Sequence, residues 1–170
     1  VFTGDLVDGS VESLKNDVEP LKNLQTPYGK YFVTGNHEYY SNALLWCNKV
    51  TNLGFNVLNN ENRIIKSGNG EIVLAGVTDF SGGNFITDHK SNPAKAIRNT
   101  NLQSTNILLA HQPRTIFEAS RLGYDLQISG HTHGGQLIPW QYLTRLAQPY
   151  MSGLHKHENT WIYVNQGTGY

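Results

Sequence analysis

The stretch SGHTHGGQ, residues 129–136, follows the apolar run YDLQI and places two histidines one residue apart among glycines. On an extended backbone His131 and His133 point to the same side, because side chains alternate between faces with a period of two. That spacing is typical of metal ligands, although a polar turn explains an isolated pair equally well. The glycines favour the metal interpretation, since glycine permits conformations and close approaches that other residues do not. The stretch therefore predicts a strand that ends in a metal-binding loop.

Three other apolar runs also end in oxygen or imidazole donors. VFTGD ends at Asp5, YFVTGNH ends at Asn36 and His37, and NILLAH ends at His111. Taken singly, each has an ordinary structural explanation, such as a turn or a hydrogen-bonded core histidine. Ligands of open α/β sheets bind at the loops beyond the strand ends, so we expect these side chains to converge.

Together with the histidine pair, these residues offer a carboxylate, an amide oxygen and imidazoles. Such a set suits a first-row divalent metal and does not suit calcium, which takes oxygen ligands. The two oxygens of Asp5 allow it to bridge two ions at the separation of roughly 3.5–4 Å found in two-metal hydrolytic sites. The sequence therefore predicts a metal-dependent site built from several strand ends.

Short apolar runs alternate with helix-like segments along the chain, which indicates an α/β or mixed sandwich arrangement. Strands are expected at YFVTG, FNVLNN, NILLAH, DLQISG and TWIYVNQ, and RIIKSG and EIVLAGV are expected to form a hairpin. Helices are expected after Ser10, after Ser41 or Asn42, in NPAKAIRN, and in PRTIFEASRLG between Pro113 and Gly123. Residues 82–88 are expected to form a polar loop, and residues 137–158 follow no clear pattern.

The helix after Ser41 or Asn42 has apolar residues at helical spacing. Leu44, Cys47 and Val50 are expected on one buried face, and Gly54 is expected to stop the helix.

The bulk composition fits one domain, residues 1–170, with a sizeable core. The 13 basic and 13 acidic residues give no net charge, so no overall field favours nucleic acid, anionic membranes or acidic partners. The single cysteine, Cys47, excludes an intrachain disulfide framework and a cysteine-based zinc site. No apolar run approaches the roughly 20 residues of a membrane span. Because the chain opens and closes on strand-like segments, we expect it to be a fragment cut at both ends.

Four motifs resemble those of a known superfamily. GDLVD, GNHE and GHTHGG, in that order and with LLAHQP between the last two, are similar to the motif set of the calcineurin-like metallophosphoesterases. LLAHQPRT, DLQISGHTHGGQLIPW and IYVNQGTGY are most similar to its membrane-associated bacterial branch, which includes cell-wall-associated phosphodiesterase-like proteins and UDP-diacylglucosamine pyrophosphatases. The resemblance covers essentially the whole chain. It implies a four-layer α/β/β/α sandwich of two mixed sheets, here expected to be truncated at both ends.

The resemblance also implies metal ligands. Asp5 is similar to the aspartate that bridges two ions, and Asn36, His111 and His131 match ligands of the second metal. His133 matches a ligand of the first metal. Two divalent ions are therefore expected, and manganese, iron, zinc or a mixed pair all suit these ligands.

The resemblance assigns catalytic roles to two further residues. His37 matches the histidine beside the scissile phosphate, and Asp8 resembles the carboxylate that orients this histidine in some branches. Two cations would neutralise phosphoryl oxygens and lower the pKa of a water for in-line attack. A protonated His37 would stabilise developing charge or protonate the leaving alkoxide.

One family motif is absent from this sequence, namely the Asp-x-His that follows the opening strand. The first metal is then left with Asp5 and His133, fewer than the roughly three protein ligands of an ordinary catalytic site. We therefore expect this chain alone to hold at most one ion with useful affinity and to be weakly active or inactive.

The leading hypothesis is a hydrolase for a phosphomonoester, phosphodiester or pyrophosphate, with a lipid-linked or sugar-nucleotide substrate left open. The alternative is a non-catalytic metal-binding or interaction module derived from the same fold. A nucleic-acid-binding domain is disfavoured, because no basic patch with interleaved aromatics appears. The resemblance leaves membrane association open, through segments outside this chain.

Several residues have two open interpretations. Tyr39 and Tyr40 either border the substrate pocket or pack on the core. Four residues either line the site or lie on the surface, namely Asp79, His89, His155 and His157. Four others either contact lipid or pack within the domain, namely Trp140, Tyr142, Leu143 and Leu146.

Overall fold

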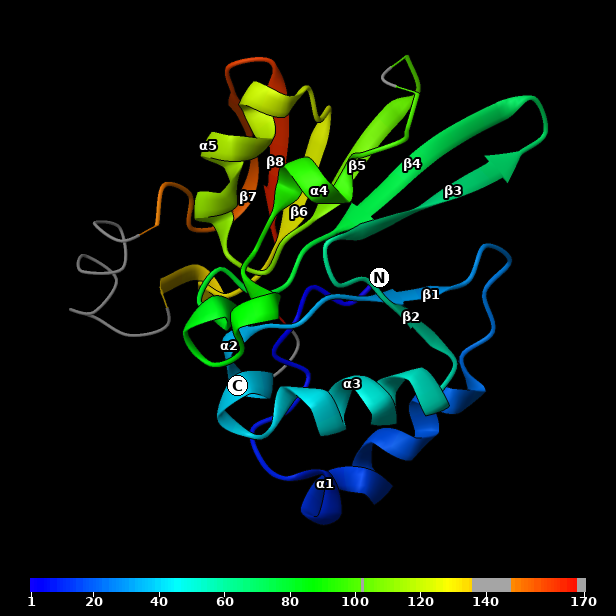
Figure 1. Cartoon of the computed structure of the whole chain (residues 1–170), viewed down its shortest axis with the longest axis vertical. Coiled ribbons are helices and arrows are strands. Elements are labelled where there is room, and N and C mark those ends of the chain that lie inside the picture. Colours follow the sequence, from blue (N-terminus) through cyan, green and yellow to red (C-terminus); the bar gives the residue numbers. More distant parts are fainter. Residues whose placement is uncertain (102, 136–147, 168–170) are drawn as a thin grey trace.

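A computed structural model describes residues 1–101, 103–135 and 148–167, which form two β-sheets and the helices around them (Figure 1). The larger sheet has six strands in the order β3-β4-β5-β6-β8-β7. These strands are β3 Glu61–Ser67, β4 Gly70–Gly76, β5 Thr105–Leu109, β6 Leu126–Ser129, β7 Gly153–His157 and β8 Thr160–Val164. The smaller sheet pairs β1 Lys30–Phe32 with β2 Phe55–Val57 in parallel, and the opening segment adds a bridge from Phe2 to Phe32.

Strand direction in the larger sheet is mixed, as expected. The hairpin of β3 and β4 is antiparallel, and so is the pairing of β7 with β8. Between them, β4, β5, β6 and β8 run parallel. Their carboxyl ends therefore meet at one edge of the sheet, which is where polar loops can come together.

The two sheets and their helices form layers (Figure 1). One apolar cluster, which includes Leu108, Ile116 and Ile162, packs the larger sheet against the segment with α4 and α5. A second, which includes Val33, Leu58 and Leu109, fills the space between the sheets. The third cluster packs the smaller sheet against α1 and α3. Its buried members include Phe32, Trp46, Val50, Leu53 and Phe55. The predicted α/β/β/α sandwich is therefore confirmed.

Two helices cover the smaller sheet. Helix α1, Val11–Val18, begins at Ser10, whose hydroxyl accepts a hydrogen bond from the Ser13 amide at 3.2 Å, as its N-cap position predicts. Its end turns into a 3₁₀ helix, Glu19–Asn23, because Pro20 cannot donate to the α-helical ladder. Helix α3, Ala43–Asn52, is capped by the Asn42 side chain.

The expected face of α3 is partly wrong. Leu44 is 52% exposed, whereas Cys47 and Val50 are buried as predicted and the face is completed by Ala43 and Trp46. The run ALLWC is apolar on every side, so its periodicity does not determine which face packs. The Trp46 indole decides it, since its N–H donates to the Gly9 carbonyl at 2.9 Å beneath the loop before α1.

The remaining segments follow the expected order with shorter elements. Helix α2, Asn36–Tyr40, starts directly after β1, and α4, Pro93–Ala96, forms the short helix predicted for NPAKAIRN. The single helix expected from Pro113 to Gly123 consists of 3₁₀ turns flanking α5, Ile116–Ala119, and ends where Gly123 adopts φ 81°. Residues 82–88, expected as a loop, contain the 3₁₀ turn Gly82–Asn84 and the start of a second, Thr87–His89.

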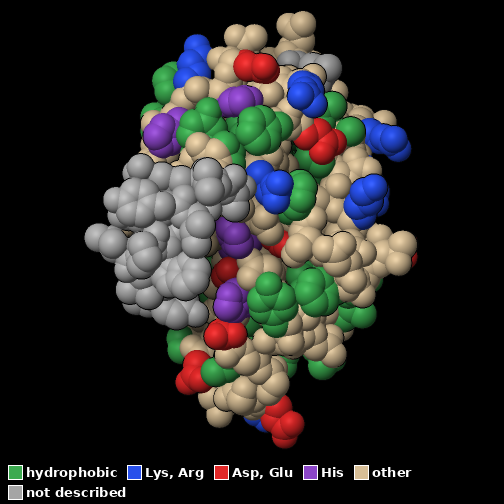
Figure 2. All heavy atoms as spheres, turned by 90° about the vertical axis from the view of Figure 1, so that its left-hand side faces the viewer, with side chains coloured by type: hydrophobic (Ala, Val, Ile, Leu, Met, Phe, Trp, Pro, Cys, Tyr) green, Lys and Arg blue, Asp and Glu red, His purple; other side chains and the backbone are tan. Residues whose placement is uncertain are grey.

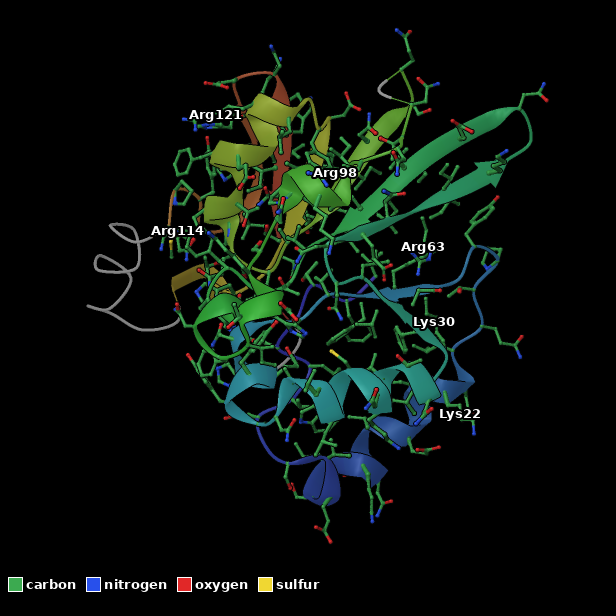
Figure 3. The ribbon with its side chains drawn as sticks, viewed as in Figure 1. Lys22, Lys30, Arg63, Arg98, Arg114 and Arg121 are labelled. Carbon is green, nitrogen blue, oxygen red and sulfur yellow. The ribbon has the colours of Figure 1, made fainter. Side chains whose placement is uncertain are left out.

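One lysine ties the far end of the smaller sheet to both covering helices. The Lys30 ammonium donates to the carbonyls of Leu21, Lys22 and Leu53, at 3.0, 3.2 and 2.7 Å. In Figure 3, Lys30 and Lys22 lie at the end of the molecule away from α2, whereas Arg114 lies on the same side as α2. The carbonyls at the ends of these helical segments thus gain a cationic partner, which is favourable at helix C-termini.

Within the described ranges, no helix has the length and apolarity needed to cross a membrane. Residues 137–147, including Trp140, Tyr142, Leu143 and Leu146, lie outside those ranges. The later part of the stretch without a clear pattern contains β7, Gly153–His157.

Candidate metal centre

Three of the predicted ligands meet at the strand ends. One ligand atom from each of Asp5, His111 and His131 lies within 4.8 Å of the others. Asp5 follows the opening segment, His111 follows β5, and His131 follows β6. The convergence expected from the strand ends is therefore present between the two sheets.

The Nε2 atom of His111 is the centre of this cluster. It lies 3.0 Å from Asp5 Oδ2, 3.2 Å from Asn36 Oδ1 and 3.1 Å from His131 Nδ1. One imidazole nitrogen has a single proton or a single lone pair, so it cannot satisfy three such partners as hydrogen bonds. A divalent cation accepts a carboxylate, an amide oxygen and two imidazoles at once, so these residues fit the metal chemistry of the family.

The other nitrogen of His111 is fixed by the backbone. Its Nδ1 lies 2.6 Å from the Thr3 carbonyl oxygen, which can only accept a hydrogen bond. Nδ1 therefore carries the proton, and Nε2 is the nitrogen free to coordinate. Such an outer hydrogen bond sets the tautomer and orientation of a metal-binding histidine.

A tight turn aims Asp5 at His111. Asp5 has φ 53° and follows Gly4 at φ 89°, both in the left-handed region. A Cβ on Gly4 would come within 2.4 Å of the Gly35 nitrogen, and a Cβ on Gly35 would come within 2.2 Å of Asp5 Oδ1. The GD and GN pairs of the motifs therefore need glycine because the two loops touch at their backbones.

Glu38 holds these two loops together from beneath. Its carboxylate accepts the amide N–H groups of Asp5, Leu6 and Gly35, at 3.0, 2.9 and 2.6 Å. The side chain is completely buried, and burial raises the pKa of the Glu38 carboxyl although the Gly35 amide works in the opposite direction. No role was predicted for Glu38 from the sequence, although it is the glutamate of the GNHE motif.

The loop after β6 also adopts left-handed backbone conformations. His131 has φ 73° and His133 has φ 47°, which are uncommon for residues other than glycine. Gly134 continues the turn at φ 67°. Side chains therefore do not follow the alternation of an extended strand here, and the His-x-His spacing acts through a turn. His133 lines the same cavity as His131, and its assignment as a metal ligand stays a prediction.

His37 and Asp8 form the predicted pair at the edge of the cluster. His37 Nδ1 lies 3.0 Å from Asp8 Oδ1, and the side chains are 29% and 69% exposed. The His37 amide donates to Asp5 Oδ1 at 2.9 Å, which links the pair to the metal cluster. His37 therefore has one ring nitrogen oriented by a carboxylate and the other available to a substrate.

Burial and charge have opposite effects on the pKa values of the candidate ligands. Burial alone would lower the pKa of His111, but the hydrogen bond and charge of Asp5 raise it above its ordinary value. Burial would raise the pKa of Asp5, but the His111 hydrogen bond and charge hold it below the usual range. Burial and the neighbouring His111 lower the pKa of His131 to about 4. His131 is thus a neutral imidazole at pH 7, the form that binds metals.

These residues open into one cavity of about 650 Å³. Its acidic and histidine side chains are Asp5, Asp8, His37, His111, His131 and His133, and its apolar wall includes Phe2, Ile128 and Tyr163. Figure 2 shows histidine and acidic side chains in a hollow on this face. The volume is within the range of small-molecule sites.

A buried carboxylate lies behind the ligands. Asp79 is completely buried, and its carboxylate accepts from the Gln112 amide and from the amide and hydroxyl of Ser81. It does not belong to the three-residue cluster. Its charge favours protonated His111 and His131 and so acts against the burial that lowers the pKa of His131. The other undecided residues pair elsewhere: His89 with Tyr39, His155 with the Ser152 carbonyl, and His157 with Tyr150.

Comparison with known proteins agrees with this geometry. The chain is 41% identical over 172 residues to an uncharacterized metallophosphoesterase of Helicobacter pylori, covering 98% of this chain and 44% of that protein. It is 39% identical over 182 residues to a Bos taurus transmembrane protein with metallophosphoesterase domain, covering 100% of this chain and 41% of that protein. The chain thus spans less than half the length of either relative.

A solved structure supports the fold. The sulfate thiohydrolase SoxB of Thermus thermophilus superposes with a TM-score of 0.64 at 15% identity, covering 96% of this chain and 33% of that one. Residues 1–135, which include the metal cluster, His37 and Asp8, match the calcineurin-like phosphoesterase family. By its matched residues, its relatives and its fold, the chain belongs to the calcineurin-like phosphoesterases, a metal-dependent family.

Proposed function

We propose that this domain hydrolyses a phosphoester with water, using two divalent metal ions. The observation that carries the proposal is the convergence of Asp5, His111 and His131 on one cavity that also contains the paired His37 and Asp8. A metal cluster beside an oriented acid is the arrangement that phosphoryl transfer to water requires.

The ligands divide between the two ions in the proposal. Asp5, Asn36, His111 and His131 would hold one ion, and Asp5 with His133 would contribute to the other. When bound, the metal pair supplies Lewis-acid polarisation of the phosphoryl oxygens and lowers the pKa of water. Manganese, iron, zinc or a mixed pair suits these donors.

The side chains of the protein orient the metal ligands and protonate the leaving group in this proposal. Asp5 Oδ2 lies next to His111, and Asp5 Oδ1 accepts a hydrogen bond from the His37 amide. One carboxylate thus positions the metal ligands relative to the acid. The proton on a charged His37 passes to the leaving oxygen, and Asp8 stabilises the imidazolium before that transfer. The His37 side chain is partly exposed and lines the cavity, so a substrate that enters from solvent can reach it.

The substrate is proposed only by chemical class. Mono-, di- and pyrophosphate esters all carry the oxygens that such a site binds, and lipid-linked or sugar-nucleotide substrates remain within this proposal. The Bos taurus relative's name mentions a transmembrane protein, which supports membrane association of the full-length protein.

The test compares the full-length protein with its Asp5→Asn variant. Asparagine keeps the side-chain shape and tolerates the positive φ at this position, so the change removes mainly the charge and one anionic donor. We expect Mn²⁺-dependent hydrolysis of p-nitrophenyl esters by the parent protein, abolished by chelation and restored by Mn²⁺. Metal analysis should find at least one ion fewer in the variant, with turnover reduced at least about 100-fold. Equal metal content and turnover in both proteins would refute the assignment of Asp5, and a parent protein without metal-dependent turnover would refute the hydrolase.

A further inference from the structure

Two large aromatic side chains lie exposed next to the proposed acid. Tyr40 is 62% exposed and Phe85 is 51% exposed, although rings of this size usually bury most of their surface. The Tyr40 ring centroid lies 5.4 Å from that of His37, and the Phe85 centroid lies 5.8 Å from that of Tyr40. The rings of His37, Tyr40 and Phe85 therefore form a series in which each ring lies next to the following one.

The pair is held in place from its buried side. Tyr39 is 6% exposed, and its ring packs against Phe85 with centroids 5.6 Å apart. Its hydroxyl lies 2.8 Å from His89 Nδ1 and 3.3 Å from Thr34 Oγ1, which fixes the ring that supports Phe85. The Phe85 ring is thus supported from its buried side, and preorganisation of this kind lowers the entropic cost of binding a ligand.

The direction of the reaction fixes which part of a substrate reaches these rings. The attacking water oxygen bonds to phosphorus while the bond from phosphorus to the leaving oxygen breaks. The leaving oxygen takes its proton from His37 and must therefore lie beside that imidazole. The group attached to the leaving oxygen is then within reach of the Tyr40 ring, whose centroid lies 5.4 Å from that of His37.

We propose that Tyr40 and Phe85 form a leaving-group subsite that binds a planar aromatic group, and that this subsite determines specificity within the proposed hydrolase function. The rings are tilted by 59° and 60° along the series from His37 to Phe85, so a third ring can pack edge-to-face or offset against them. Aromatic groups prefer these arrangements. Figure 2 shows hydrophobic side chains grouped beside one of the histidines in the hollow, in agreement with an apolar border there.

The test compares esters that differ in aromaticity alone. Benzyl phosphate and benzyl methyl phosphate are assayed against their cyclohexylmethyl counterparts, which have the same number of carbon atoms and a similarly basic leaving alkoxide. The readout is the ratio of kcat/KM for the benzyl ester to that for the cyclohexylmethyl ester, measured on the metal-loaded full-length protein. We expect a benzyl preference of about 2- to 10-fold, the size expected of one or two aromatic contacts.

Two variants and a control locate the preference. Tyr40→Leu and Phe85→Leu keep an apolar side chain at an exposed position and remove the ring, so each should fold and should bring the ratio close to one. Phe117→Leu is the matched control: Phe117 is 46% exposed and lies in α5, away from α2 (Figure 1), where its ring packs against His157. The control should keep the benzyl preference of the parent protein.

A binding measurement decides the proposal even without turnover. Benzylphosphonate and cyclohexylmethylphosphonate, which cannot be hydrolysed, are titrated calorimetrically into the Mn²⁺-loaded protein and both variants. Tighter binding of the benzyl compound, lost in both variants, supports the subsite independently of hydrolysis. Equal affinities, a preference for the cyclohexyl compound, no binding of either, or a preference unchanged in both variants overturns it. If the parent protein showed no metal-dependent turnover but still bound the benzyl compound more tightly, the proposed function would be refuted and the subsite would be supported.

Discussion

Replacing Glu38 by glutamine tests whether a buried carboxylate positions the metal cluster. In the structure, Oε2 accepts the amides of Asp5 and Gly35, and Oε1 accepts the amide of Leu6. Glutamine keeps the shape but exchanges one oxygen for an NH₂ group. In either amide orientation, at least one backbone N–H then faces another donor.

The magnitude follows from this lost acceptor. An unsatisfied buried donor costs about 1–3 kcal/mol, partly offset because glutamine has no charge to bury. For a chain of this length, that corresponds to a fall in Tm of about 3–10 °C. An effect of similar size is expected on metal binding, since changes to groups that orient ligands typically cost about 10- to 100-fold in affinity.

The assay combines thermal unfolding by circular dichroism with calorimetric titration of Mn²⁺. Glu158→Gln is the matched control, because Glu158 is exposed and the same substitution there should change stability by no more than about 0.5 kcal/mol. If Glu38→Gln melted with the parent protein and bound Mn²⁺ within about threefold of the parent affinity, the idea that Glu38 sets the Asp5 turn would be wrong.

Two further predictions concern His37 and Cys47. His37→Gln should keep its metal content and lose about 10²–10⁴-fold in kcat, because His37 acts on the leaving group and does not bind metal; kinetics and metal analysis on one sample check this, and loss of metal would contradict it. Burial raises the pKa of the Cys47 thiol from 9.0 to about 11, so at pH 8 its reactive thiolate is about 100-fold scarcer than in the unfolded chain, and alkylation by iodoacetamide should be slower by at least that factor. Equal alkylation rates with and without denaturant, followed by mass spectrometry, would show that the thiol is accessible and unperturbed.

The sequence predicted where polar groups would gather but not how they would be held. Donors at the ends of successive strands indicated a shared edge, and in the structure Asp5, His111 and His131 lie together there. Glu38 escaped prediction because its partners are backbone N–H groups, which every residue has and no pattern marks. The same holds for the left-handed backbone at His131 and His133, where a turn replaces the alternation expected of a strand.

Helix faces and helix lengths were less predictable. Apolar residues surround the first turns of α3, so contacts distant in sequence, among them the hydrogen bond from Trp46 to the Gly9 carbonyl, decide that Trp46 packs and Leu44 does not. The segment that begins at Pro113 was predicted as one helix from its end signals, and both signals are correct. Its interior alternates between 3₁₀ and α-helical turns, a distinction that local sequence preference barely separates.

The contact between Thr3 and His111 couples assembly of the domain to its chemistry. The acceptor is a main-chain carbonyl, so no substitution of the Thr3 side chain deletes it, and only displacement of the opening segment from the larger sheet can. If that segment detached, the His111 ring would lose the partner that keeps its proton on Nδ1, and its neutral form could then carry the proton on the coordinating nitrogen. Metal affinity should thus depend on whether the first residues are packed against His111, so that metal binding and folding of the opening segment are coupled.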